Sequence, residues 1–442
     1  MKVLILGDDG RAHALAWKLF ASPAADLLCG PGNGGTAQLA PQVELALDNA
    51  AEVTRWAFDE AIDLIIPAAS EPLAAGLVDE IVAVQIGVCG PPQRSTKVAT
   101  SYCAAKEFLL RHGLPTPNGR AFNDLATAEK YLAAQPMPIA LRPDAPATGA
   151  LVFHERYAAL EGLRTLLSLH PLEGGSSSVV IEAHMPGVLV SFSALTDGTT
   201  ALPMLPTRIY DQLSDAADSP LAPGMGAHTG SSVYAAKLRD YLQQHIIAPL
   251  IAAFAKDRLP YWGFIGVDCL IGEQGPRIVG LRCTMRDMEA QVVLPRLEDD
   301  LLPLLQATIA RRLDQLSPLR WRDEPSVAIS LVAHGYPKHY AVGGVIGGLT
   351  DLDPGVLIFH HQTHNAAGLR HTPLRSKANP LVGLLMGRST LEGITTTGGH
   401  VCTVVALGAT LQGARGRALI NADRVTFNGR SYRADIGASE FR

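Results

Sequence analysis

Short apolar runs alternate with amphipathic segments through the first hundred residues. VLILG (3–7), DLIIPA (63–68) and GVCG (87–90) have the pattern of buried strands, whereas HALAWKLF (13–20) and AAGLVDEIVAV (74–84) have the pattern of helices. Strands that alternate with helices in this way predict a parallel sheet with helices on both faces.

The next part of the chain has the pattern of a smaller α+β unit. A helical segment, SYCAAKEFLLRHG at 101–113, ends at Gly113 and the two prolines that follow it. Residues from about 121 to 190 then combine three strand-like runs with one amphipathic helix. These are PIALR (138–142), LVFH (151–154), SVVIEAHM (178–185) and the helix YAALEGLRTLLSLH (157–170).

The remaining residues predict a second mixed region. Residues 203–231 are rich in Pro, Gly and Asp, which predicts a long functional loop. A helical pattern at 239–256 leads to a hairpin over 263–283, turned by GEQG. From about residue 325, apolar runs predict three more strands around a polar insertion at roughly 361–394.

Composition places the chain among globular proteins. Its 442 residues are too many for one compact core, so we expect about three structural units. A formal charge of only −5 gives no basic field that would favour nucleic acid, and no apolar run is long enough for a membrane helix. The six cysteines form no CxxC pair, which suggests neither a zinc site nor a disulfide framework and favours a reduced cytoplasmic location.

Two glycine-rich loops follow predicted strands and are candidate anion sites. Gly7–Lys18 opens a helix, whose first N–H groups and positive dipole end suit a phosphate. Gly30–Ala37 would lie at the same carboxyl edge of the sheet, where ligands bind in doubly wound folds. The alternatives are a tight strand-to-helix turn for the first loop and a surface turn for the second, and the charges of Asp8 and Asp9 count against an anion.

Motifs along nearly the whole chain, taken in order, resemble the phosphoribosylamine–glycine ligase family of purine biosynthesis, also called glycinamide ribonucleotide synthetases. Each motif is weak alone, and the combination carries the resemblance. The motifs are GDDGRAHALAWK (7–18), GPGNGGT (30–36), SEPLAAGLVDE (70–80), CGPP (89–92), AAKEFLLRHGLPTP (104–117), PGMGAH (223–228), YWGFIGV (261–267), GYPKHYAVGGVIGGL (335–349), TTTGGHVCTVVALG (395–408) and ADIG (434–437).

The resemblance implies an α/β fold of the ATP-grasp ligase type. Its parts would be a preATP-like, doubly wound N domain at 1–103, an ATP-grasp region at 104–325 with an α+β lid at about 121–190, and a C-terminal α+β domain at 326–442. The implied reaction activates glycine as an acyl phosphate with MgATP, after which the amine of phosphoribosylamine displaces phosphate. The implied partners are phosphoribosylamine or a related phosphoribosyl compound, and glycine or a related carboxylate, bound to a monomer or homodimer.

Several positions depart from the family's nucleotide site. Arg142 stands where the family has a phosphate-contacting lysine, and Ala150 stands where it has a second one. Glu182 begins the family's adenine-hinge segment, but the acidic pair of that segment is Val188 and Leu189 here. Lys106 is the nearest match to an ATP-binding lysine of the family and would join Arg142 and Glu182 in holding the nucleotide, unless it lies on a solvated helical face.

The family's metal ligands are also replaced. Gly280 and Arg282 stand where the family has the glutamate and the asparagine that hold the metal. Asp268, Asp287 and Glu289 are the carboxylates that could bind a displaced metal. Alternatively, Arg142, Arg282 and Arg286 could neutralise a phosphate without metal, because guanidinium groups suit bidentate phosphate contacts.

The phosphoribosyl half keeps more of the family pattern. Gly10 and Arg11 remain from the first loop, Gly32, Asn33 and Gly34 from the second, and Gly224 and Gly226 from the later PGMGAH stretch. These are the candidate substrate-binding residues. A histidine-rich tract at His360, His361, His364 and His371 matches no metal-ligand spacing, so we expect solvated loop histidines there.

Two functions therefore remain open at this stage. In the first, the chain is a ligase in which Arg142, Asp287 and Glu289 take part in catalysis, with ATP and a relocated Mg²⁺. In the second, it is an inactive paralogue that binds a phosphoribosyl ligand or a partner through the N domain without ligation.

Overall fold

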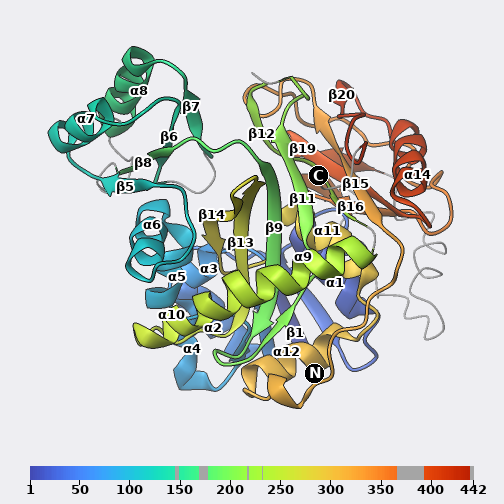
Figure 1. Ribbon diagram of the computed structural model, residues 1–442. Coiled ribbons are helices and arrows are strands. Elements are labelled where there is room, and N and C mark those ends of the chain that lie inside the picture. Colours follow the sequence, from blue (N-terminus) through green and yellow to red (C-terminus); the bar gives the residue numbers. More distant parts are fainter. Residues whose placement is uncertain (145–148, 169–177, 217–218, 231, 366–392, 439–442) are drawn as a thin grey trace.

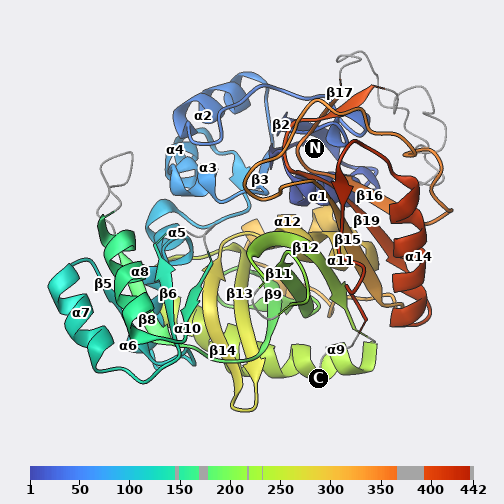
Figure 2. The same ribbon diagram turned by 90° about the horizontal axis from the view of Figure 1, so that it is seen from above.

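The computed structural model describes residues 1–442 with the exception of 145–148, 169–177, 217–218, 231, 366–392 and 439–442. Seen from above in Figure 2, a small lobe lies on one side of the molecule and α14 on the other, with the strands of a large sheet between them. No described helix is both long and apolar enough to span a bilayer.

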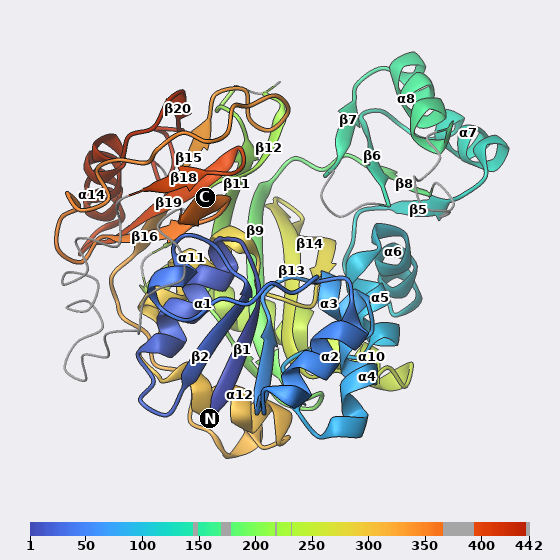
Figure 3. The same cartoon turned by 180° about the vertical axis from the view of Figure 1, so that it is seen from behind.

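The N-terminal region forms the predicted parallel sheet, in the order β2-β1-β3-β4 (Figure 3). Alternate residues of β1 enter two different cores, Val3 and Ile5 on one face and Leu4 and Leu6 on the other. The elements are β1 (Lys2–Gly7), α1 (Gly10–Phe20), β2 (Asp26–Pro31), α2 (Ala50–Asp59), β3 (Leu64–Pro67), α3 (Glu71–Ala74), α4 (Leu77–Ile81), β4 (Gly87–Val88), α5 (Gln93–Thr100) and α6 (Tyr102–Arg111).

One predicted helix of this region is divided. The pattern at 74–84 predicts a single helix, but Gly76 has φ +92° and separates α3 from α4. That left-handed conformation cannot continue an α-helix and is open to glycine at little steric cost.

The segment predicted to be a lid forms a separate lobe, seen at the upper left of Figure 1 and called the lid from here on. Its four strands pair in the order β5-β8-β6-β7, and two helices pack on them around a core made of lid residues alone. The elements are β5 (Gly119–Phe122), α7 (Leu125–Ala133), β6 (Ile139–Pro143), β7 (Leu151–Phe153), α8 (Arg156–Ser168) and β8 (Val179–Ala183).

A ten-stranded sheet forms the centre of the molecule, with its main path in the order β14-β13-β9-β11-β12-β15-β19-β16. β10 pairs with β9, β20 pairs with β15, and β17 and β18 form a separate pair. The strands are β9 (Val188–Thr196), β10 (Ala201–Pro203), β11 (Thr207–Gln212), β12 (Leu221–Thr229), β13 (Gly263–Gly272), β14 (Gly275–Arg282), β15 (Ser326–Ala333), β16 (Leu357–His360), β17 (Thr363–Asn365), β18 (Ile394–Thr396), β19 (His400–Leu407) and β20 (Arg430–Ser431).

Helices from three parts of the chain pack around this sheet. Residues of α1, α11 and α12 share one hydrophobic core, so the N-terminal region is joined to the sheet by continuous apolar packing. The helices are α9 (Ser232–Leu242), which continues through a π-helical turn into α10 (Ala248–Lys256), α11 (Asp287–Val293), α12 (Leu301–Ile309) and α14 (Leu411–Arg424).

The prediction of a long loop at 203–231 is wrong, because β11 and β12 occupy most of it. Its glycines serve close packing within the sheet. A Cβ atom at Gly226 would lie 2.8 Å from Ile436 Cγ1 and 2.9 Å from the carbonyl oxygen of Ala328, so a larger residue would not fit. The polar insertion predicted at 361–394 lies mostly outside the described residues.

Candidate functional site

A cavity of about 1080 Å³ lies between the lid, the β13–β14 hairpin and the first loop of the N-terminal region. Its wall includes the positions at which the chain departs from the ligase family. These are Arg142, Ala150, Val188, Leu189, Gly280 and Arg282, and Glu182 lines the wall beside them. Positions scattered over 140 residues of sequence are therefore neighbours around one space.

Glu182 lies between two cations at the lid side of this cavity. Its Oε2 is 2.6 Å from Lys106 Nζ, and its Oε1 is 2.5 Å from Arg142 Nε. Lys106 also donates hydrogen bonds to Thr116 Oγ1 at 2.8 Å and to the carbonyl of Pro117 at 2.7 Å. Burial lowers the pKa of Lys106, and Glu182 opposes that shift. Lys106 is thus a buried ion-pair partner, which excludes the solvated helical face considered for it.

The register of the β13–β14 hairpin places Asp268 opposite Gly280. One oxygen of Asp268 pairs with Arg282, and the other lies 2.7 Å from Arg286 Nη1. Burial opposes ionisation of Asp268, but the charges of Arg282 and Arg286 outweigh it and lower its pKa. Arg286 also pairs with Asp211, which extends the row of alternating charges.

Glu289 lies beneath this row and is fully buried. Its Oε2 accepts hydrogen bonds from the hydroxyls of Ser191 and Ser193, both at 2.8 Å, and from the backbone N–H of Arg286 at 3.1 Å. Arg282 Nη2 is 3.4 Å from the same oxygen. Glu289 thus caps the first turn of α11 and links this helix to Arg282 of the β13–β14 hairpin.

The residues present do not fit a Mg²⁺ ion at the position implied by the family, because such an ion needs several oxygen ligands around one point. Both oxygens of Asp268 are paired with arginines, and Asp287 lies in contact with two histidines instead. Glu289 Oε1 has no hydrogen-bond partner among the described residues, but one buried oxygen is too few. The guanidinium groups of Arg282 and Arg286 occupy the space between these carboxylates.

The candidate substrate residues of the first loop are engaged with the protein itself. Asp9 caps α1 and accepts hydrogen bonds from the N–H groups of Arg11 and Ala12. The Arg11 side chain pairs with Asp9 at 2.6 Å and reaches Thr284 Oγ1 at 3.3 Å. Gly10 N–H donates to His361 Nδ1 at 3.2 Å. The carboxylate of Asp9, whose charge counts against a bound anion, thus occupies the N-terminus of α1 itself.

Asn33 connects the second loop to the C-terminal segment. Its amide donates to the carbonyl of His360 at 2.8 Å and to that of Asp8 at 3.0 Å, and its oxygen accepts from Gly35 and Thr36. The backbone N–H groups of Gly32 and Gly34 are also bonded within the protein. Among the PGMGAH glycines, Gly224 donates to Asp211 Oδ1 at 3.0 Å, and Gly226 lies in the sheet.

The prediction of solvated histidines is wrong for two members of the tract. His360 and His361 are 0% and 1% exposed, because β16 carries them inward against α1, whereas His364 is exposed. His371 lies outside the described residues. Sequence reasoning also missed His400, the first residue of β19, which stacks on His361. No spacing in the sequence signals this pair, since 39 residues separate its members.

Comparison with known proteins identifies the family. Residues 1–98 match the N domain of phosphoribosylglycinamide synthetase, 100–290 its ATP-grasp (A) domain and 326–439 its C domain. A phosphoribosylamine–glycine ligase of Vibrio cholerae is 32% identical over 99% of this chain and 98% of its own length. The chain belongs to the phosphoribosylglycinamide synthetase family.

Solved structures support the predicted fold. A phosphoribosylamine–glycine ligase of Thermotoga maritima has a TM-score of 0.79 at 21% identity, covering 98% of this chain and 100% of its own. The biotin carboxylase domain of Hydrogenobacter thermophilus 2-oxoglutarate carboxylase, solved with MgADP, has a TM-score of 0.70 at 13% identity, covering 97% and 91%. The ATP-grasp architecture and the family resemblance predicted from the motifs are thus confirmed, and ATP and Mg²⁺ are the cofactors that this family implies.

Proposed function

We propose that this chain catalyses ATP-dependent amide formation between phosphoribosylamine and glycine, or between a related phosphoribosyl amine and a related carboxylate. The observation that carries the proposal is family membership over the whole length, combined with a cavity large enough for a nucleotide at the lid. In this reaction the carboxylate takes the terminal phosphoryl group of ATP and releases ADP. The amine then attacks the acyl carbon, expels phosphate and loses a proton.

Arginines supply the positive charge that the phosphoryl groups require. Arg142 and Arg282 line the cavity, and Arg286 joins them beside Asp268. Guanidinium groups bind phosphate in a bidentate manner and keep their charge at any working pH. They would therefore neutralise a triphosphate by exchanging their present carboxylate partners for phosphate oxygens. In this proposal Arg142 contacts the phosphates from the lid, and its ion pair with Glu182, which also binds Lys106, sets its orientation.

The same substitutions favour a second candidate function, which is binding without ligation. A site that holds fixed arginines in place of a metal cannot form the metal bridge between phosphate oxygens that phosphoryl transfer commonly uses. In that case the chain would bind a phosphate-bearing ligand and release no product.

Two measurements separate these functions. Calorimetric titration with ATP, once with Mg²⁺ and once with EDTA, should show saturable binding in both, weakened by Arg142→Ala and unchanged by the control Arg164→Ala on the lid surface. Phosphate release should then require ATP, glycine and phosphoribosylamine together. Binding without phosphate release would favour the second function, and absence of ATP binding at millimolar concentration would overturn the ligase proposal.

A further inference from the structure

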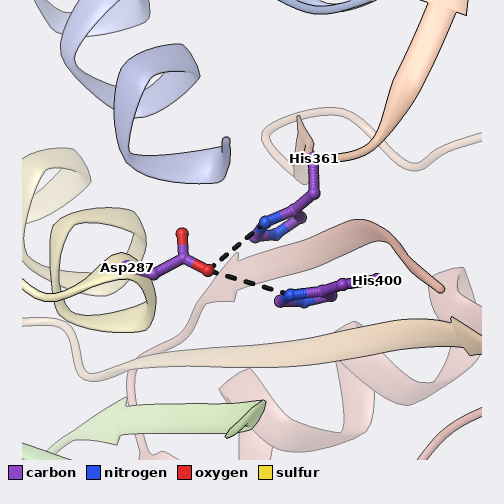
Figure 4. Close-up of side chains that lie close together, drawn as sticks. All are labelled: Asp287, His361 and His400. Carbon is purple, nitrogen blue, oxygen red and sulfur yellow. Dashed lines mark ion pairs between the residues drawn. The ribbon is translucent and has the colours of Figure 1, made fainter. Parts of the chain in front are cut away.

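Three side chains from distant parts of the chain converge at the inner edge of the cavity (Figure 4). Asp287 begins α11, His361 follows β16, and His400 begins β19. Asp287 Oδ2 lies 3.3 Å from His361 Nδ1 and 3.8 Å from His400 Nδ1. The two imidazole rings stack, with centroids 3.6 Å apart and planes inclined by 21°.

Hydrogen bonds fix the tautomer of His361. Its Nδ1 accepts the backbone N–H of Gly10 at 3.2 Å, so this nitrogen carries a lone pair rather than a proton. The proton of the neutral ring is then on Nε2, which lies 2.8 Å from Thr403 Oγ1. That lone pair is engaged by the Gly10 N–H, and Asp287 Oδ2 lies 3.3 Å from the same nitrogen.

A parallel argument fixes His400. The Ser330 hydroxyl donates its proton to the carbonyl of Gly224, so at 3.0 Å it accepts from His400 Nε2. His400 Nδ1 therefore also carries a lone pair toward Asp287. Two ring nitrogens and one carboxylate oxygen, all electron-pair donors, thus face one another with their outer hydrogen bonds already made.

Only one oxygen of the Asp287 carboxylate lies beside the histidines, because its Oδ1 accepts a hydrogen bond from Gln291 Nε2 at 2.8 Å. Nearby, Asp9 is paired with Arg11, and Oδ2 of Asp287 is the oxygen that lies beside the two histidines.

We propose that Asp287, His361 and His400 form a binding site for a divalent transition metal of the zinc class. Two imidazole nitrogens with one carboxylate oxygen suit zinc, whereas Mg²⁺ prefers oxygen ligands alone. The donor separations of 3.3 and 3.8 Å suit ligands of one metal at distances of about 2.0–2.2 Å. The stacked rings of His361 and His400 must turn apart on binding, so that both lone pairs point at the metal. The partners Thr403 and Ser330 supply the outer hydrogen bonds that orient ligating histidines.

Access to the site comes from the cavity. The Asp287 side chain is 25% exposed and lines the cavity wall, while His361 and His400 close the site from behind. Metal binding at His361 Nδ1 displaces the N–H of Gly10, and further coordination positions stay open toward the cavity. This site differs from the one implied by the family, which lies at Gly280 and Arg282 on the hairpin.

The test uses the full chain after dialysis against a chelator. Titration with Zn²⁺ should show one tight site that Mg²⁺ does not fill, and Co²⁺ should give the visible absorption of a site of low coordination number. His400→Ala and Asp287→Asn should each weaken Zn²⁺ binding by more than about 100-fold, because loss of even an outer-shell partner costs 10–100-fold. His364→Ala, an exposed histidine near the site, should bind as the wild type does.

Circular dichroism of each variant shows whether it is folded. Should His400→Ala fail to fold, Asp287→Asn tests the site alone, since it is nearly isosteric and lies at a helix start. Absence of tight Zn²⁺ binding by the wild type, or equal binding by wild type and Asp287→Asn, would overturn the proposal.

Discussion

Replacing Glu182 by glutamine tests the buried charge cluster of the lid. The exchange keeps the shape of the side chain but removes the charge between Lys106 and Arg142. The Lys106 side chain is only 5% exposed, so its ammonium group would keep two neutral acceptors and no counter-charge, whereas Arg142 at 12% can turn toward the cavity. Removing one partner of a buried ion pair costs about 3–5 kcal/mol, and we expect Glu182→Gln to fall in this range.

The cost should depend on pH with a definite sign. Burial already lowers the pKa of Lys106 in the folded protein, and loss of Glu182 lowers it further. Between this folded-state pKa and the unfolded value of about 10.4, the unfolded chain binds more protons, so stability rises with pH. The difference between Glu182→Gln and wild type should therefore shrink as the pH is raised through this window toward 10.

Urea unfolding followed by circular dichroism measures the loss in free energy of unfolding. Hydrogen exchange of β5, β8 and α6 shows whether these elements, which surround the ion pair, are the ones destabilised. Glu129→Gln is the matched control, because it removes a carboxylate from an exposed lid pair with Arg164 and should change nothing measurable. Adding Lys106→Met to Glu182→Gln should recover much of the stability. Equal midpoints for Glu182→Gln and Glu129→Gln, or no recovery in the double variant, would refute the argument.

The double variant Gly280→Glu, Arg282→Asn should gain Mg²⁺-dependent thermal stability that the wild type lacks. A Cβ atom at Gly280 would lie 3.4 Å from Asp268 Oδ2, an ordinary contact, so the glutamate fits. Its carboxylate would then share a cation with Asp268. Asn33→Ala should lower the free energy of unfolding by roughly 2–4 kcal/mol in urea titration, since several buried backbone groups lose their partners. Gly226→Ala should cost about 1–3 kcal/mol in the same assay through overpacking against the sheet.

Matched variants control these measurements. Gln38→Ala removes a single hydrogen bond from the loop of Asn33, and should cost less than Asn33→Ala. Gly416→Ala lies within α14, where a Cβ meets nothing within 4 Å, and should be neutral or stabilising by up to about 1 kcal/mol. If Gly226→Ala is as stable as Gly416→Ala, Gly226 is not needed for close packing of the sheet. If Mg²⁺ stabilises the wild type, the prediction for the Gly280→Glu, Arg282→Asn variant is wrong.

Sequence patterns predict the local elements well where burial follows a simple period. The strands of the N-terminal sheet and the β13–β14 hairpin are confirmed because their apolar runs are bounded by glycine, proline or polar turns. The loop prediction for residues 203–231 is wrong because prolines and glycines usually mark loops. Here the glycines allow close packing between strands instead.

The site is harder to predict, because its side chains are brought together by tertiary structure. Substitution at Gly280 and Arg282 indicates the loss of metal ligands, but the pairing of Arg282 with Asp268 depends on a hairpin register that sequence does not fix. Asp287 lines the cavity, and α11 also places it against His361 and His400. Neither histidine shares a sequence motif with it.

The pairing of β12 with β15 affects how the chain can be divided for study. Gly226–Thr229 pairs with Ser326–Ile329, so the matched A and C domains share one hydrogen-bond ladder. A truncation at residue 325 would leave β12 as an exposed edge of nine residues, Leu221–Thr229, and such edges invite pairing between molecules. The fragment 1–325 should therefore aggregate when produced alone, and co-expression with 326–442 should keep it in solution.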